Sequence, residues 1–266
     1  MSRTSRIARA ARTAAMTAAL AVGTAVAFPS AAQAADAEHY YIQIGGTGET
    51  PPAPHCTYSY DAANEALQLG DSAIPVCYPA TAGPFIGPNG PLLEGLEPHP
   101  DAITAPSYDA SVQQGYQEAL RVAKETHRAH PDARITITGY SQGAQVADEV
   151  LQTIAAGGTG IPLSQVDGKL YADPMQPGTG FTANIPRGWG VPGFTSPGAG
   201  PTDFNGIPVT RYCITGDPVC DASLLNAPGY FSLHGNYPAP GNAIAQTLGD
   251  APGNGIQWRN PDGSPR

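Results

Sequence analysis

The chain alternates between short stretches with the apolar periodicity of β-strands and longer stretches with the periodicity of helices. Residues 134–138 (RITIT) alternate β-branched apolar and polar side chains, which is typical of a strand. Downstream, apolar residues recur at the three- and four-residue spacing of one helix face, which ends at Gly157-Gly158. These residues are Ala147, Val150, Leu151 and Ile154. The pattern therefore predicts a strand, a tight turn and a helix around residue 141.

The same two periodicities recur along most of the chain. Further strands are predicted at residues 40–44, 73–78, 169–172 and 209–214, the last of which is the final strand that the pattern indicates. Helices are predicted near 61–69 and across 112–123, the second with Asp109 or Ser111 as its N-cap. Repeated alternation of strands and helices predicts an α/β fold, with a mainly parallel central sheet flanked by helices on both faces.

The turn between the strand at 134–138 and its helix carries the sequence Gly139-Tyr140-Ser141-Gln142-Gly143. A serine on such a strand-to-helix turn is exposed as a nucleophile, and the flanking glycines let the strand and the helix approach closely. The backbone N–H of Gln142, at the start of the helix, faces the same space. The alternative is a glycine-rich turn whose serine only caps the helix. The strand before the turn and the helix after it favour the nucleophile.

A serine nucleophile needs a base to take its proton, and the base needs an acid to orient it. In α/β-hydrolases the acid and then the histidine follow the serine along the chain. Of six histidines, only His234 follows Ser141, so His234 is the candidate base. Asp217 is favoured as the acid because it comes directly after a predicted strand and lies between two cysteines. Asp173 and Asp221 are its competitors.

A glycine-rich turn, Gly45–Thr50, follows the first predicted strand, and ligands of α/β sheets collect at such strand ends. The turn contains part of a dinucleotide-binding fingerprint. The fingerprint is incomplete, however, and Pro51-Pro52 stands where its helix would continue, so nucleotide binding is rejected. The turn can instead aim backbone N–H groups and the Thr47 hydroxyl at an anion.

Residues 174–208 have no useful periodicity and many prolines and glycines, together with scattered aromatic side chains. The aromatic residues are Phe181, Trp189, Phe194 and Phe204. Loops of this length in compact domains are usually functional or mobile. One hypothesis is that the segment covers the active site and presents apolar surface to an acyl chain. The alternative is that its aromatic rings only pin the loop to the body of the protein.

The N-terminus has the features of a secretory signal peptide. Four arginines precede an uncharged apolar run at residues 13–28, and Ala32-Gln33-Ala34 is a small-x-small cleavage site. We therefore predict a signal peptide at 1–34 and a single α/β domain at 35–266, a comfortable length for one core. An uncleaved N-terminal anchor is the competing interpretation. Cleavage near Ala34 would deliver the protein to the cell envelope or the medium, without an integral membrane segment.

Composition narrows the possible partners. Removing 1–34 leaves nine basic side chains against 22 acidic ones, which argues against nucleic acid and anionic membranes as partners. The four cysteines of a secreted chain are expected to form disulfides. Three pairings are possible, and local pairing of Cys56 with Cys77 and of Cys213 with Cys220 closes short loops. The spacing does not suit a zinc site, and no metal or cofactor is expected.

Two families share these motifs. Residues 139–143 together with 213–220 (CITGDPVC) are similar to cutinase, whose acid lies in such a disulfide loop, followed by its histidine. Other stretches resemble the PE-PPE C-terminal domain of actinobacterial serine esterases, over nearly the whole mature chain. These stretches are Ile44–Gly48, Tyr78–Ala80, Ser111–Gly115 and His234–Tyr237. The first two cysteines of the chain do not follow the other disulfide of cutinase.

The resemblance to cutinase implies an α/β-hydrolase fold in which Asp217 is the acid, His234 is the base and Cys213 is bonded to Cys220. It further implies an oxyanion hole made by Thr47 and the N–H of Gln142. We expect a secreted serine esterase that forms an acyl-enzyme on a small-molecule or lipid ester. The alternatives are an acyltransferase to a sugar or lipid hydroxyl and a non-catalytic envelope protein, although the intact Ser-Asp-His set weighs against the latter.

Overall fold

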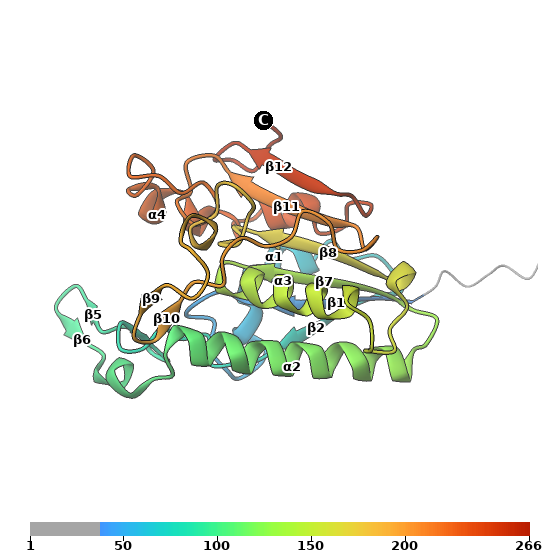
Figure 1. Ribbon diagram of the computed structural model, residues 1–266, viewed down its shortest axis with the longest axis horizontal. Coiled ribbons are helices and arrows are strands. Elements are labelled where there is room, and N and C mark those ends of the chain that lie inside the picture. The colour runs from blue at the N-terminus through green and yellow to red at the C-terminus, as the bar shows by residue number, and fades with distance from the viewer. Residues whose placement is uncertain (1–37) are drawn as a thin grey trace, which may run out of the picture. The chain divides into compact units, whose positions relative to one another are not determined.

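A parallel sheet of six strands, in the order β12-β11-β8-β7-β1-β2, forms the centre of the part of the chain that the structure describes (Figure 1). The computed structural model describes residues 38–266. The predicted signal peptide and its cleavage site at Ala34 lie outside these residues, so that boundary stays a prediction. The six strands are β1 (His39–Ile44), β2 (Asp71–Val76), β7 (Arg134–Tyr140), β8 (Val166–Tyr171), β11 (Val209–Ile214) and β12 (Gly255–Arg259).

The other strands are two residues long and form three small hairpins. They are β3 (Ile86–Gly87) with β4 (Gly90–Pro91), β5 (Leu93–Glu94) with β6 (Glu97–Pro98), and β9 (Gly190–Val191) with β10 (Phe194–Thr195). The α-helices are α1 (Asp61–Asn64), α2 (Tyr108–Ala129), α3 (Gln142–Ala155), α4 (Gly229–Ser232) and α5 (Ala243–Thr247). The 3₁₀ helices are η1 (His55–Tyr60), η2 (Pro100–Thr104), η3 (Leu163–Gln165), η4 (Thr182–Asn184) and η5 (His234–Asn236).

Alternation along the strands builds a separate apolar core on each face of the sheet. Ile42 of β1 and Ile137 of β7 point to one face, where they pack with residues of α2 and α3. Tyr41 of β1 points to the other face and packs with residues of α1 and α5. Because both faces are covered, the central strands are buried almost throughout. The predicted mainly parallel sheet flanked by helices is confirmed.

The structure differs from the predicted elements in three details. The helix expected near 61–69 is the single turn α1, because Leu69 is fully exposed and cannot extend an apolar face. The N-cap of α2 is Ser107, whose hydroxyl accepts the N–H of Ala110 at 3.3 Å, and not Asp109 or Ser111. The edge strand β12 was missed, since it is mostly exposed and lacks the apolar alternation of the inner strands.

Two disulfides cross-link the chain at the ends of strands. Cys56 in η1 is bonded to Cys77, which follows β2, and Cys213 at the end of β11 is bonded to Cys220. Both local pairings considered from the sequence are therefore present. Within residues 38–266, none of the helices combines the length and the apolar character needed to cross a membrane.

Candidate active site

Ser141 lies on the turn between β7 and α3 with a backbone φ of 56°, a left-handed value that is uncommon outside glycine. The chain is very crowded around it. A Cβ on Gly139 would lie 2.1 Å from the carbonyl oxygen of Gly143, and a Cβ on Gly143 would lie 2.3 Å from that of Ile44. Only glycine fits at these two positions. The Ser141 side chain does not cap α3, and its hydroxyl contacts a different group.

That group is His234. The Oγ of Ser141 lies 2.8 Å from Nε2 of His234, and Nδ1 of His234 lies 3.0 Å from a carboxylate oxygen of Asp217. An ionised carboxylate can only accept, so Nδ1 carries the proton and Nε2 is left to accept from the serine hydroxyl. The structure thus brings together the three side chains predicted as nucleophile, base and acid. Asp217 is fully buried and His234 nearly so.

The loop that carries Asp217 is closed on several sides. The Cys213–Cys220 disulfide joins its two ends. The N–H of Val219 donates to the Asp217 carboxylate at 3.1 Å. Asp221, a competitor for the role of acid, accepts the N–H of Gly216 at 2.9 Å and so serves the loop itself. The position of the Asp217 carboxylate is therefore fixed independently of its contact with His234.

Aromatic rings surround His234, a feature that the sequence analysis did not anticipate. The imidazole stacks with Tyr140 and Tyr230, with ring centroids 5.2 and 5.1 Å apart. The Tyr140 hydroxyl donates to the backbone carbonyl of His234 at 2.5 Å. Tyr140 sits inside the G-x-S-x-G motif, so its position was visible in the sequence, whereas nothing marked Tyr230. These contacts restrict the ring plane of the histidine.

The Gly45–Thr50 turn runs alongside the nucleophile. A Cβ on Gly46 would lie 3.2 Å from the Cβ of Ser141. Among the described residues, none accepts a hydrogen bond from the N–H of Thr47 or of Gln142. The Gln142 side chain is engaged elsewhere, accepting from the Ser111 hydroxyl at 3.0 Å and donating to a backbone carbonyl. The backbone N–H groups of Thr47 and Gln142 are thus left available for an oxygen of a ligand.

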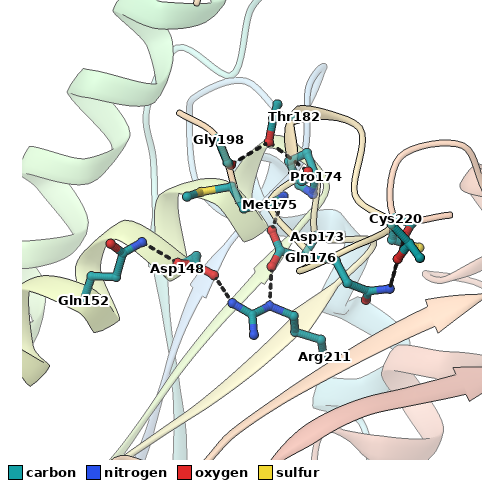
Figure 2. A network of polar contacts seen from close by, with 11 residues as sticks. Asp148, Gln152, Asp173, Pro174, Met175, Gln176, Thr182, Gly198, Arg211 and Cys220 are labelled. Carbon is teal, nitrogen blue, oxygen red and sulfur yellow. Dashed lines mark hydrogen bonds and ion pairs between the residues drawn. The ribbon is translucent and has the colours of Figure 1, made fainter. Parts of the chain in front are cut away.

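Asp173 has a different partner from the one that a catalytic acid needs. Figure 2 shows Arg211 of β11 between Asp148 of α3 and Asp173, which follows β8. Its Nε donates to Asp173 at 2.6 Å, and its Nη2 donates to Asp148. All three side chains are buried, and burial raises the pKa of Asp148 to about 7. The Asp173 carboxylate therefore joins the start of segment 174–208 to α3 and β11.

Segment 174–208 uses its aromatic residues in two ways. Phe204 is buried beneath the Arg211 guanidinium, 5.3 Å from its ring centroid, and pins the segment to the body. Phe181 and Phe194 line a cavity of about 270 Å³ that also borders Tyr108 and the 82–85 loop. Trp189 is largely exposed. Phe204 therefore pins the segment to the body, as one interpretation predicted, whereas Phe181 and Phe194 line an apolar cavity.

The described residues contain no cluster of His, Cys, Asp or Glu that could hold a metal ion. His130, which follows α2, pairs with Glu38 at 2.6 Å. The geometry therefore offers a nucleophile, a base, an oriented acid and two backbone donors around one point. Such a set can attack a carbonyl and stabilise the resulting oxyanion.

Known proteins are similar to this chain in sequence and in fold. The model of the Cutinase family matches residues 76–247. The "Uncharacterized PPE family protein PPE28" of Mycobacterium tuberculosis is 29% identical over 219 residues, which are 78% of this chain. The chain spans 30% of the length of that relative.

Two solved structures illustrate the likeness in fold. A cutinase-like protein from Cryptococcus sp. is 19% identical, with a TM-score of 0.49 over 80% of this chain and 91% of the other. The catalytic core of acetyl xylan esterase from Trichoderma reesei is 22% identical, with a TM-score of 0.49 over 76% and 93%.

The buried Arg211 yields a stability prediction. Replacing it in Arg211→Met leaves two buried carboxylates without a counter-charge, so we expect the free energy of unfolding to fall by about 3–5 kcal/mol at pH 8 in urea denaturation. At pH 5 the loss should be smaller, because Asp148, with its raised pKa of about 7, is then protonated and needs no cation.

Arg121→Met is the matched control, because Arg121 pairs with two glutamates on the exposed face of α2. Exposed ion pairs contribute less than about 1 kcal/mol, so little change is expected there. Equal losses in the two variants, or a loss for Arg211→Met that does not depend on pH, would contradict the assigned role of Arg211.

Proposed function

Because this chain belongs to the cutinase family, a family of carboxylic ester hydrolases, we propose that it is a serine esterase with Ser141, His234 and Asp217 as its catalytic triad. The observation that carries the proposal is the unbroken line of contacts from the Asp217 carboxylate through both nitrogens of His234 to the Ser141 hydroxyl. A serine that only capped a helix would have no need of this arrangement.

In the first half of the reaction, Ser141 Oγ attacks the ester carbonyl carbon while its proton moves to Nε2 of His234. The Asp217 carboxylate stabilises the imidazolium through the Nδ1–H bond. The tetrahedral intermediate then collapses, and the proton on Nε2 passes to the leaving alcohol. In the second half, water gives its proton to His234 and attacks the acyl-enzyme carbonyl. The second tetrahedral intermediate then collapses, the carboxylic acid leaves, and His234 returns the proton to Ser141 Oγ.

We assign the oxyanion hole to the N–H of Gln142 and to Thr47. Neither backbone N–H has an acceptor among the described residues. Gln142 directly follows Ser141, and Thr47 follows Gly46, which packs against Ser141. The Gln142 N–H is also at the first residue of α3, where the helix dipole favours negative charge. Donors that are already in position before charge develops are the main source of rate enhancement in such sites.

We further propose that the acyl chain of the ester enters the cavity beside segment 174–208. The cavity borders Tyr108, whose hydroxyl donates at 2.9 Å to Gln145 of α3, four residues after Ser141. Its other wall begins one residue after Thr81, whose carbonyl holds the Gln142 side chain. A volume of about 270 Å³ with a mostly apolar lining suits a chain of methylenes and not a sugar.

We infer that the protein is exported and cleaved near Ala34. Both disulfides suit an oxidising compartment outside the cytoplasm. N-terminal sequencing of the protein recovered from the culture medium or envelope fraction should begin near Ala35. A sequence that begins at Met1 would refute the cleavage.

The triad is tested with a panel of p-nitrophenyl esters from acetate upward. Ser141→Ala should lower kcat by at least about 10⁴-fold, because no other hydroxyl can form the acyl-enzyme. Asp217→Asn should also cost about 10⁴-fold, since an amide that donates to the imidazole favours the wrong tautomer. Asp173→Asn should reduce kcat far less and act mainly on stability, because Asp173 is bonded to Arg211.

Ser72→Ala, on the exposed edge strand β2, is the matched control and should retain full activity. Near-normal turnover in Ser141→Ala would sink the mechanism. A larger loss of kcat in Asp173→Asn than in Asp217→Asn would transfer the role of acid to Asp173. If added trehalose or a simple alcohol captured most of the acyl group, transfer would replace hydrolysis as the main reaction.

The acyl site is tested by filling the cavity. Ala82→Leu adds bulk to its lining, so it should lower kcat/KM for octanoate by about tenfold or more, as two excluded methylenes cost about 0.8 kcal/mol each. The value for acetate should stay within about twofold, because a two-carbon acyl group does not reach the cavity. The comparison uses the same ester panel.

Ala66→Leu makes the same change at an exposed position outside the cavity and should leave both values unchanged. A parallel fall for acetate and octanoate in Ala82→Leu, or no change in either, would place the acyl chain elsewhere.

A further inference from the structure

Glu49 is a buried carboxylate that the triad mechanism does not use. It is 1% exposed and lies in the Gly45–Thr50 turn, two residues after Thr47. One of its oxygens accepts the N–H of Gly46 at 2.7 Å, and the other accepts the N–H of Ser59 at 3.0 Å. Burying a carboxylate is costly unless its oxygens are satisfied. This one is satisfied by two backbone groups from separate parts of the chain.

The bonds of Glu49 close the turn around Thr47. The backbone N–H of Glu49 donates to the carbonyl of Gly46 at 3.1 Å, while its side chain accepts the N–H of Gly46. Residues 46 and 49 are thus joined in both directions, as in a capping box. Because the N–H of Gly46 is directed into the carboxylate, the N–H of Thr47 is left free to point elsewhere.

The second carboxylate oxygen anchors this closed turn to a rigid part of the protein. Ser59 belongs to η1, and Cys56 of the same 3₁₀ helix is disulfide-bonded to Cys77 at the end of β2. The carboxylate also packs against Gly45, where an added Cβ would lie 2.7 Å from it. Glu49 therefore fixes the position of the turn relative to the sheet.

A carboxylate is well suited to this position for a chemical reason. Two N–H groups approach from different directions, and an ionised carboxylate offers acceptor oxygens to both without carrying a donor. A glutamine would turn its NH₂ toward one of them, and a protonated glutamic acid would turn its O–H. Only the ionised form satisfies both bonds.

We propose that Glu49 is a positioning residue for the oxyanion hole, whose ionised carboxylate holds the 45–50 turn so that Thr47 faces the oxyanion beside Ser141. This inference rests on the proposed esterase function. It adds a residue that touches neither substrate nor triad, and that acts through the placement of the turn. Its effect is on the transition state, because the oxyanion forms only there.

Burial raises the pKa of Glu49 to about 7. The ionisable groups that surround it are His55, Tyr58 and Tyr60 of η1, Tyr78 after β2, and Tyr140 of β7. Burial raises the pKa of each of these tyrosines, so they stay neutral from pH 5 to 8. The folded-state pKa of Glu49 lies above its unfolded value of 4.5, so the ionised carboxylate costs stability, and this cost grows between pH 4.5 and about 7 and then levels off.

Activity and stability should therefore respond to Glu49 in opposite directions. Glu49→Gln should lower kcat for a p-nitrophenyl ester at pH 8 by about tenfold or more, with little change in KM. This is less than the roughly 100- to 1000-fold cost of losing an oxyanion-hole donor, because the donor is displaced and not removed. The kcat ratio of wild type to variant should shrink toward pH 5, where wild-type Glu49 is protonated and resembles glutamine.

Thermal unfolding separates this role from a structural one. The Tm of Glu49→Gln relative to wild type should rise from pH 5 to pH 8, because the variant lacks the buried charge. Taking the ratio to wild type removes the pH effects that both proteins share. Each rate is divided by the concentration of folded enzyme, which is measured by labelling with a fluorophosphonate probe. Glu65→Gln, at an exposed glutamate of the same region, is the control and should change neither quantity.

The proposal is overturned if folded Glu49→Gln keeps kcat within twofold of wild type at pH 8, or if its kcat ratio does not vary with pH. If Glu49→Gln does not fold, Glu49→Asp replaces it. This variant keeps two acceptor oxygens but shortens their reach, and an unchanged kcat would again refute the role. The two proposals fail separately, because Ser141→Ala that retains activity refutes the esterase mechanism, whereas normal Glu49→Gln beside inactive Ser141→Ala refutes only the role of Glu49.

Discussion

The close approach of three backbone segments at Ser141 is the constraint on which the site depends. Gly143 lies so near the end of β1 that a Cβ there would come within 2.3 Å of the Ile44 carbonyl oxygen. The residues that follow Ile44 form the 45–50 turn, so the same packing sets nucleophile and turn side by side. Ser141 adopts a φ of 56° as a consequence of this crowding. The geometry is enforced by the backbone before any side chain takes part.

Each loop that contributes to the site follows a strand and is held by a specific interaction of its own. The 45–50 turn after β1 is held by the Glu49 carboxylate, and the start of segment 174–208 after β8 is held by Arg211 through Asp173. The Asp217 loop after β11 is held by its disulfide. Two of these interactions involve buried charges, which cost free energy unless they are paired or hydrogen-bonded. They contribute order in loops that strand packing cannot restrain.

Local patterning predicted the elements that are buried on both sides, and it was weakest for those that are not. The strand before Ser141 and the helix after it were clear, because the core imposes strict periods of two and of three to four residues on them. The edge strand β12 lacks a continuous apolar face and was missed, and α1 is shorter than predicted because its apolar face does not continue to Leu69. Predictability therefore followed burial and not proximity to the site.

The sequence by itself determined the position of the candidate nucleophile and, since a single histidine follows Ser141, of its partner His234. It favoured Asp217 as the acid and left Asp173 as a competitor, because both follow a strand and both stand where a catalytic acid could. Only the tertiary structure places Arg211 beside Asp173 and His234 beside Asp217. It also brought Glu49 to the N–H of Ser59. Such pairings join residues far apart in the chain, so they depend on strand order and loop packing, which residue order alone does not encode.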